Sequence, residues 1–166
     1  MTTKNYDRLI ESATEQYLPD ADWRLIKAQL IAESNLNTEV VSPAGAQGIA
    51  QFMPATWKEI SAEMGYGKNS TPLDPELAIP ACAYYMRKLW DQWTWKRPAA
   101  DRYALALASY NAGFGNIIKA QKAASNTTDY ATIIAALQHI TGSHANETKA
   151  YVRSIYGYWM GMILEP

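Results

Sequence analysis

The sequence has few of the features that would crosslink a fold or mark it for a membrane or a nucleic acid. Among its 166 residues Cys82 is the single cysteine, so no disulfide can form within the chain. There is no run of about 18 apolar residues, and residues 1–17 carry charge throughout, without an apolar signal-peptide core. The formal net charge is −1, with no basic run. We therefore expect a fold without disulfides, a chain without a signal peptide or membrane insertion, and no nucleic-acid partner.

The composition is that of a globular protein. Hydrophobic residues make up 48% and charged residues 19% of the chain, and the length suits one domain over residues 1–166. Phenylalanine is scarce, with two residues against eleven tyrosines and six tryptophans. Such amphipathic rings suit a groove that holds a polar ligand with flat faces, although most of them are expected to fill the core.

Apolar residues recur with helical spacing along most of the chain, which predicts a mainly α fold of seven or eight helices. Asp20 or Asp22 is expected to cap the second helix. Residues 37–54 contain Gly, Pro and a short β-branched run, and are expected to form a Gly-rich loop or a small hairpin. The expected helices cover 6–17, 21–35, 55–64, 74–93, 99–111, 116–124, 130–140 and 147–164.

One acidic residue stands out on the second expected helix. Trp23, Ile26 and Leu30 form an apolar stripe, and Glu33 falls about 20° from Ile26 at 100° per residue. Burial raises the pKa of a carboxyl group, and the negative end of a helix dipole acts in the same direction. A neutral carboxylic acid could protonate a glycosidic oxygen. The periodicity alone also allows Glu33 to extend into solvent.

Four short blocks follow one another in the chain. They are ESNL at 33–36, SPAGAQGIAQFMPATW at 42–57, ASYNAG at 108–113 and ETKAYV at 147–152. In this order they resemble the soluble lytic transglycosylase family, part of the lysozyme-like superfamily that includes goose-type lysozyme. The resemblance implies a lysozyme-like single domain whose partner is the glycan strand of peptidoglycan, bound in a cleft, with Glu33 as the catalytic acid.

The resemblance also implies roles for other residues. The Tyr110 hydroxyl would reach the catalytic glutamate and the sugar bound there. Ser34 follows the catalytic residue, and Tyr151 would pack beneath the site. A glycine such as Gly48 lets a loop approach a ligand closely, and a glutamine such as Gln51 can donate and accept at once. The substrate-binding residues are expected to be Ser42, Gly48, Gln51, Met53, Tyr110, Asn111 and Glu147.

The mechanism implied by the resemblance uses one carboxylate. Between Glu33 and Glu59 the only other acid is Glu39, so a partner carboxylate for activating water is not evident. The resemblance implies instead a lyase reaction that forms 1,6-anhydromuramoyl ends. No metal and no cofactor are expected, and His139 and His144 lack zinc-ligand spacing. The alternatives left open are a hydrolytic goose-type-like lysozyme and a non-enzymatic wall-binding or virion module.

The tryptophan-rich segment 90–95 could stack on sugar faces, but the favoured interpretation is that it anchors a long helix to the core. For the biological role we expect a monomeric bacteriophage endolysin. Such a protein would stay in the host cytoplasm until a separate pore-forming protein releases it to the periplasm and the cell wall. The alternatives left open are a virion-associated lysin and an excised catalytic domain.

Overall fold

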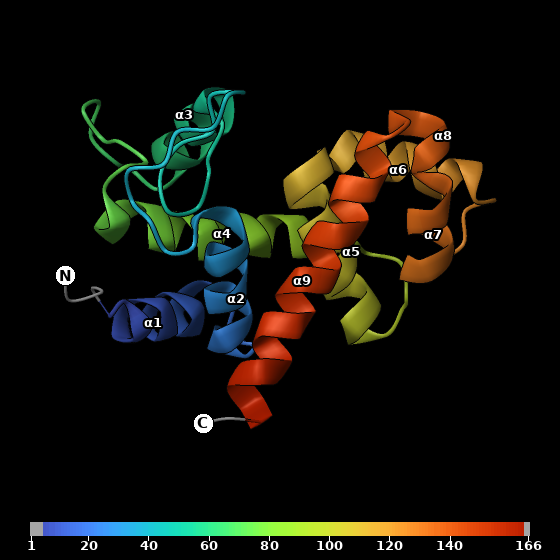
Figure 1. Cartoon of the computed structure of the whole chain (residues 1–166), viewed down its shortest axis with the longest axis horizontal. Helices are drawn as coiled ribbons and strands as arrows, with labels where there is room; N and C mark the ends of the chain where they lie inside the picture. The colour runs from blue at the N-terminus through green and yellow to red at the C-terminus, as the bar shows by residue number, and fades with distance from the viewer. Residues whose placement is uncertain (1–4, 165–166) are drawn as a thin grey trace. The chain divides into compact units, whose positions relative to one another are not determined.

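The structure, a computed structural model, describes residues 5–164, and within this range it is helical with no strand (Figure 1). The prediction of a mainly α fold is confirmed. None of the described helices is both long and apolar enough to cross a bilayer. The nine helices of the described range are α1 Asp7–Tyr17, α2 Trp23–Ser34, α3 Pro54–Glu63, α4 Pro75–Gln92, α5 Ala99–Ala112, α6 Phe114–Ala123, α7 Tyr130–Ala136, α8 Gln138–Thr141 and α9 His144–Leu164.

The chain gathers into two compact units. In the described part, the first unit comprises residues 5–85 and 155–164, and the second comprises residues 86–154. The helices α4 and α9 contribute residues to both units, because the unit boundaries fall inside them. That residues 1–166 form a single domain stays a prediction.

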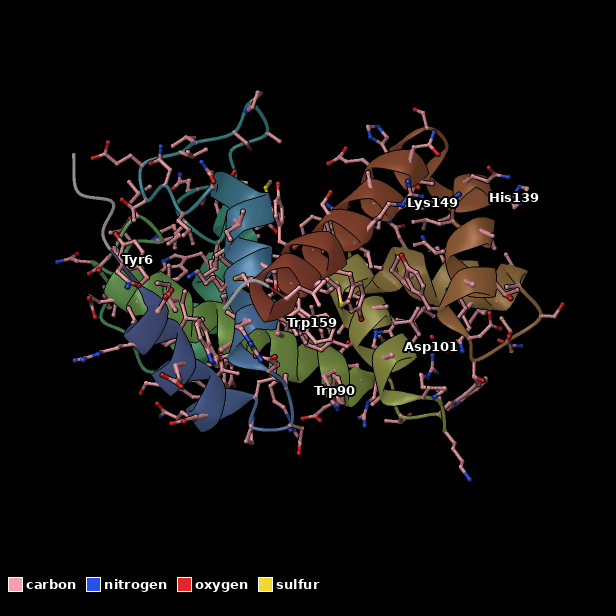
Figure 2. The ribbon with its side chains drawn as sticks, turned by 60° about the horizontal axis from the view of Figure 1, so that its bottom comes forward. Tyr6, Trp90, Asp101, His139, Lys149 and Trp159 are labelled. Carbon is pink, nitrogen blue, oxygen red and sulfur yellow. The ribbon has the colours of Figure 1, made fainter. Side chains whose placement is uncertain are left out.

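In the first unit, α2 begins at Trp23, two residues after the expected start, because Asp22 rather than Asp20 caps its first turn. The Asp22 carboxylate accepts from the backbone N–H of Arg24 at 3.0 Å and from its guanidinium at 2.8 Å. The indole of Trp159 on α9, labelled in Figure 2, donates to the same carboxylate at 3.1 Å. Burial raises the pKa of Asp22, but the bonds from Arg24 and Trp159 outweigh it and hold the pKa below its ordinary value.

Between α2 and α3 the chain forms a loop that replaces regular pairing with a few specific contacts. Asn35 ends α2 in the left-handed conformation, with φ of 54°. Two isolated bridges, Val41 with Gln47 and Gln47 with Phe52, take the place of the hairpin that the sequence left open as an alternative. Pro54 then occupies the first turn of α3, where its missing N–H costs nothing.

The second unit is built around α5. The seven residues 103–109 are all buried, so this helix is enclosed on every side rather than on one face. Gly113, with φ of 86°, ends α5 and directly precedes α6. In this unit α5 packs against α6, and α6 packs against α7 (Figure 1).

The single helix expected over residues 130–140 is divided in the structure. The N–H of Leu137 donates to the carbonyl of Ile134, only three residues back, and α7 ends at Ala136. Leu137 keeps helical dihedral angles and is fully buried. The apolar pattern therefore continues through the break, and this pattern made the two helices look like one.

The tryptophan-rich segment places one of its three rings in the core and a second, half-buried ring against a core tyrosine. Trp93 is 2% exposed and donates to the buried Ser109 hydroxyl at 3.2 Å. Trp90 packs edge-on against Tyr103, with ring centroids 5.8 Å apart. Trp95 differs, because it is 52% exposed.

The loop between α2 and α3 depends on glycine at one position. Gly48 has φ of 76°, and a Cβ there would lie 1.9 Å from the carbonyl oxygen of Pro72. Gly45 has φ of 92°, but a Cβ there would meet no atom within 4 Å. We expect Gly45→Ala to lower the free energy of unfolding by roughly 1–2 kcal/mol, because alanine is strained at a positive φ. Gly48→Ala should lower it by about 1–3 kcal/mol more than Gly45→Ala, because its Cβ also overlaps the backbone of Pro72. Urea unfolding of both variants checks this, and equal losses would contradict it.

Two buried glutamines differ in their hydrogen bonding, and replacing them should change the stability of the protein in opposite directions. Gln29 on α2 is fully buried, and neither its amide oxygen nor its nitrogen has a hydrogen-bond partner among the described residues. Gln121 is 6% exposed, and its amide donates to the carbonyl of Thr127 at 2.8 Å. Gln29→Met should stabilise the protein by about 1–3 kcal/mol, because it removes desolvated polar atoms. Gln121→Met should destabilise it by about 1 kcal/mol, because it removes a formed bond. Calorimetric melting of both variants checks the opposite signs.

Candidate active site

The residues predicted for the site fall into two groups, one in each unit. The first unit holds Glu33, Ser34, Ser42, Gly48, Gln51 and Met53, and the second holds Tyr110, Asn111, Glu147 and Tyr151. Each group has its own surroundings within its unit.

Glu33 lies in the last turn of α2 and is half-buried. Ile26 and Leu30, which precede it on the same helical face, are fully buried. The face that carries Glu33 is thus the core face of α2, as the periodicity predicts. The nearby end of the helix presents its negative dipole, which favours the neutral form of an acid. That Glu33 is held neutral stays a prediction.

Ser34 fixes the loop against the end of α2. Its hydroxyl donates to the carbonyl of Ile49 at 2.8 Å, across 15 residues of sequence. The hydroxyl also lies 3.3 Å from the carbonyl of Leu30. Ile49 is fully buried, so the loop is attached at a point that is itself held in the core. Ser34 therefore joins the loop to the end of α2 next to Glu33, and its supporting role at the site stays a prediction.

The polar side chains of Gln51 and Ser42 bond within the loop. The side-chain nitrogen of Gln51 donates to the carbonyl of Val40 at 3.1 Å and to that of Gly48 at 2.9 Å. Both amide donors are used in this way, and the amide oxygen is the group with which Gln51 could accept from a ligand. The Ser42 hydroxyl accepts from the N–H of Ala46 at 3.0 Å. These contacts shape the loop, and contact with substrate stays a prediction for both residues.

Gly48 and Met53 differ in exposure. Gly48 is buried, and its close neighbour is the backbone of Pro72, so the absence of a side chain admits another part of the chain. Met53 directly precedes α3 and is 44% exposed. An exposed, flexible thioether can contact a ligand without a change in the fold.

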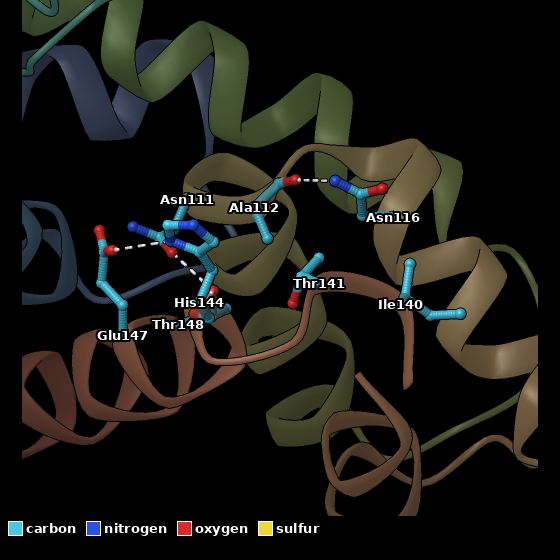
Figure 3. A pocket seen from close by; sticks show the side chains of 8 residues that line it. All are labelled: Asn111, Ala112, Asn116, Ile140, Thr141, His144, Glu147 and Thr148. Atoms are coloured by element: carbon cyan, nitrogen blue, oxygen red, sulfur yellow. Dashed lines mark hydrogen bonds and ion pairs between the residues drawn. The ribbon is translucent and has the colours of Figure 1, made fainter. Parts of the chain in front are cut away.

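In the second unit a pocket of ≈ 460 Å³ opens beside the start of α9 (Figure 3). Amide, hydroxyl, carboxylate and imidazole groups line it together with the apolar side chains of Ala112 and Ile140. Such a mixture suits a ligand rich in hydroxyl and amide groups. The polar residues that line it are Asn111, Asn116, Thr141, His144, Glu147 and Thr148.

Two predicted residues, Asn111 and Glu147, line this pocket. The buried Thr148 hydroxyl donates to the side-chain oxygen of Asn111 at 2.7 Å, so this bond does not use the amide nitrogen (Figure 3). Glu147 lies in the first turn of α9, with 71% of its side chain exposed. His144 Nδ1 lies 4.0 Å from a Glu147 oxygen, an exposed contact that contributes little to stability.

The two predicted tyrosines are half-buried, Tyr110 near the end of α5 and Tyr151 on α9. Their roles stay predictions. Among the described residues no group of three or more His, Cys, Asp or Glu is placed to hold a metal ion.

Sequence reasoning missed two groups that position the site. Thr148 belongs to the ETKAYV block, but roles were predicted only for Glu147 and Tyr151 in that block. The Thr148 hydroxyl bonds to the side chain of Asn111. A polar side chain directly after the predicted binding residue Glu147 could have indicated such a role. The carbonyl of Ile49 carries no side-chain signal at all, so its bond to Ser34 was not predictable from residue types.

With this geometry in place, comparison with known proteins defines the family. The family model described as "Transglycosylase SLT domain" matches residues 9–133. The membrane-bound lytic murein transglycosylase F of Photobacterium profundum is 32% identical over 155 residues, which cover 91% of this chain and 28% of that protein. The same-named protein of Shewanella halifaxensis is 30% identical over 158 residues, covering 91% of this chain and 30% of that protein.

Solved structures agree with the fold. The lytic transglycosylase Slt of Pseudomonas aeruginosa, solved as an inactive mutant, matches with a TM-score of 0.71 at 25% identity, over 90% of this chain and 22% of that one. A 70-kDa soluble lytic transglycosylase in complex with bulgecin A matches with a TM-score of 0.75 at 23% identity. The match covers 97% of this chain and 25% of that one. The lysozyme-like fold expected from the resemblance is confirmed, and the chain belongs to the SLT transglycosylase domain family. It spans less than a third of the length of these relatives.

Proposed function

We propose that this chain is a peptidoglycan lytic transglycosylase, a lyase that cleaves the β-1,4 bond between N-acetylmuramic acid and N-acetylglucosamine. The observation that carries the proposal is the position of Glu33. It is half-buried at the end of α2, beside a loop that Ser34 holds in place, and it lies within the residues that match the family model. The names of the relatives add the substrate class, murein.

In the first step Glu33 acts as a general acid. Its carboxylic acid gives a proton to the glycosidic oxygen, and the bond from that oxygen to the anomeric carbon breaks. The acetamido oxygen of the substrate forms a bond to the anomeric carbon and stabilises it. A half-buried position on the core face of α2 suits this role, since a desolvated acid stays protonated at higher pH than an exposed one.

In the second step the same residue acts as a base. The Glu33 carboxylate removes the proton from the muramoyl 6-hydroxyl, whose oxygen attacks the anomeric carbon and displaces the acetamido oxygen. The muramoyl product carries a 1,6-anhydro ring and the leaving sugar a free hydroxyl. Water is not consumed, and Glu33 regains its proton. An intramolecular nucleophile has a high effective concentration, which reduces the need for a second carboxylate. Glu39, the one other acid between Glu33 and Glu59, is exposed.

To the pocket in the second unit we assign the binding of a sugar and its acetamido group. The nitrogen of Asn111 can donate to a carbonyl or hydroxyl oxygen, because Thr148 already occupies its side-chain oxygen. The exposed carboxylate of Glu147 can accept from hydroxyl or amide N–H groups. The pocket thus offers one donor and one strong acceptor on the same rim.

The lyase assignment predicts the chemistry of the products. Wild-type protein should release muropeptides with anhydromuramoyl ends, each lighter by one water than the hydrolytic product, from purified sacculi. Glu33→Gln keeps the size of the side chain but removes the acid, and should lower the rate at least about 100-fold. Mass spectrometry of the digests measures both. Glu39→Gln serves as the control and should digest at the wild-type rate.

The alternative functions give different outcomes in the same assay. Reducing muramic ends would identify a hydrolytic lysozyme and overturn the lyase assignment. Binding of sacculi without release of any muropeptide by the wild type would identify a non-enzymatic wall-binding module. Wild-type release rates in Glu33→Gln would remove Glu33 from the mechanism.

As the biological role we propose phage-induced lysis of a bacterial host, with the chain reaching the wall through a pore made by a separate protein. The proposal extends the expectation drawn from the sequence. Expression of the chain alone should leave cells intact, and coexpression with a pore-forming phage protein should lyse them, as followed by culture turbidity. Coexpression with Glu33→Gln is the control and should not clear the culture. Lysis by the chain alone would contradict this role.

A further inference from the structure

A second pocket in the second unit, of ≈ 160 Å³, lies where the segment between α4 and α5 meets the end of α6. Sites for drug-sized ligands measure about 300–1,000 Å³, so this pocket can enclose only a small chemical group. It combines cationic, aromatic and amide side chains. Those that matter here are Gln92, Trp93, Trp95, Arg97, Lys122 and Asn126.

Arg97 is the more buried of the two cationic residues that line the pocket. Its guanidinium stacks over the Trp93 ring, 5.1 Å from the centroid, and donates to the carbonyls of Trp95 at 3.1 Å and Thr128 at 3.2 Å. These two bonds use two of its five N–H donors. In the described part of the chain no carboxylate lies within ion-pair distance of Arg97. The guanidinium is therefore fixed in place by contacts that do not neutralise it.

The electrostatic surroundings of Arg97 agree with this arrangement. Burial lowers the pKa of Arg97 below its ordinary value, the charge of Asp101 (labelled in Figure 2) raises it, and the charge of Arg102 lowers it again. A half-buried cation that lacks a close counter-charge attracts an anion more strongly than one that water surrounds. A guanidinium held at a fixed orientation also favours a planar, two-oxygen anion such as a carboxylate.

Trp95 and Lys122 complete the pocket at its rim. Trp95 is 52% exposed and lines the pocket with both cations, whereas Trp93 is buried and Trp90 is half-buried. Lys122 is exposed on the last turn of α6 and adds a second positive charge. An aromatic face next to two cations suits a ligand with an anionic end and an apolar neighbour.

We propose that this pocket binds the free carboxylate at the end of a short peptide, with Arg97 and Lys122 on the carboxylate and Trp95 against the adjoining apolar side chain. The proposal rests on the proposed function for the source of the ligand, the peptides that substitute the glycan strands of the wall. The two pockets share no lining residue, so this is a separate site from the pocket at Asn111 and Glu147.

The test uses ¹⁵N-labelled full chain titrated with N-acetyl-D-alanine, whose carboxylate carries one small apolar neighbour. The indole N–H signal of Trp95, assigned with Trp95→Phe, and the Nε–H signal of Arg97 should shift together and saturate. N-acetyl-D-alaninamide, which lacks the charge, should shift neither signal. Equal shifts with the acid and the amide, or no shift with the acid, would overturn the proposal.

Two further ligands distinguish the source of the anion. Acetate should bind more weakly than N-acetyl-D-alanine, because it lacks the group that contacts Trp95. If acetate binds equally well, the pocket does not recognise a peptide end. If inorganic phosphate shifts the same signals and N-acetyl-D-alanine does not, the pocket is a phosphate site and the carboxylate assignment is wrong.

Matched variants separate this site from a general effect of charge. Lys122→Gln should weaken binding of N-acetyl-D-alanine roughly threefold, the effect of losing an exposed charge pair. Lys119→Gln removes an equally exposed charge from the same helix but outside the pocket, and should leave the affinity unchanged. Equal losses in the two variants would contradict the site. All these titrations proceed without wall cleavage, so their failure is distinct from failure of the lyase assay.

Discussion

The loop between α2 and α3 must satisfy its own backbone groups, since no neighbouring strand does so, and the candidate catalytic site depends on how it meets this constraint. Ser34 bonds to the carbonyl of Ile49, and Gln51 bonds to the carbonyls of Val40 and Gly48. Gly48 in turn admits the carbonyl of Pro72. The contacts of Ser34, Gln51 and Gly48 thus take the place of strand pairing. They hold the loop beside Glu33, which lies in the last turn of α2.

Much of the fold could be predicted, because several helix ends depend on local chemistry. Asp22 caps α2, Pro54 opens α3 and Gly113 ends α5, each through a property of one residue. The break between α7 and α8 could not be predicted, because Leu137 keeps both the apolar pattern and helical dihedral angles across it. Whether the segment between α2 and α3 forms a loop or a hairpin was left open by the sequence, and the structure has two isolated bridges there, Val41 with Gln47 and Gln47 with Phe52.

For the site, periodicity located the buried face that carries Glu33, and the four sequence blocks singled out residues that line a pocket, Asn111 and Glu147. What could not be predicted is how each polar atom is used. Gln51 looked able to donate to a ligand, but its donors bond to the loop. Such assignments depend on which carbonyls the folded chain brings near, and a sequence does not contain that information.

The carboxylate of Asp22 has a thermodynamic consequence for the first unit. It accepts bonds from Arg24 and from Trp159, residues far apart in the chain, and its pKa lies below the ordinary value. An unfolded chain has the ordinary pKa and binds a proton at this group more readily. Unfolding in acid is therefore coupled to proton uptake. The contribution of Asp22 to the free energy of unfolding is fully present above its ordinary pKa and is lost as the pH falls through the lower pKa of the folded state. Acidification therefore weakens the attachment of α9 to the start of α2.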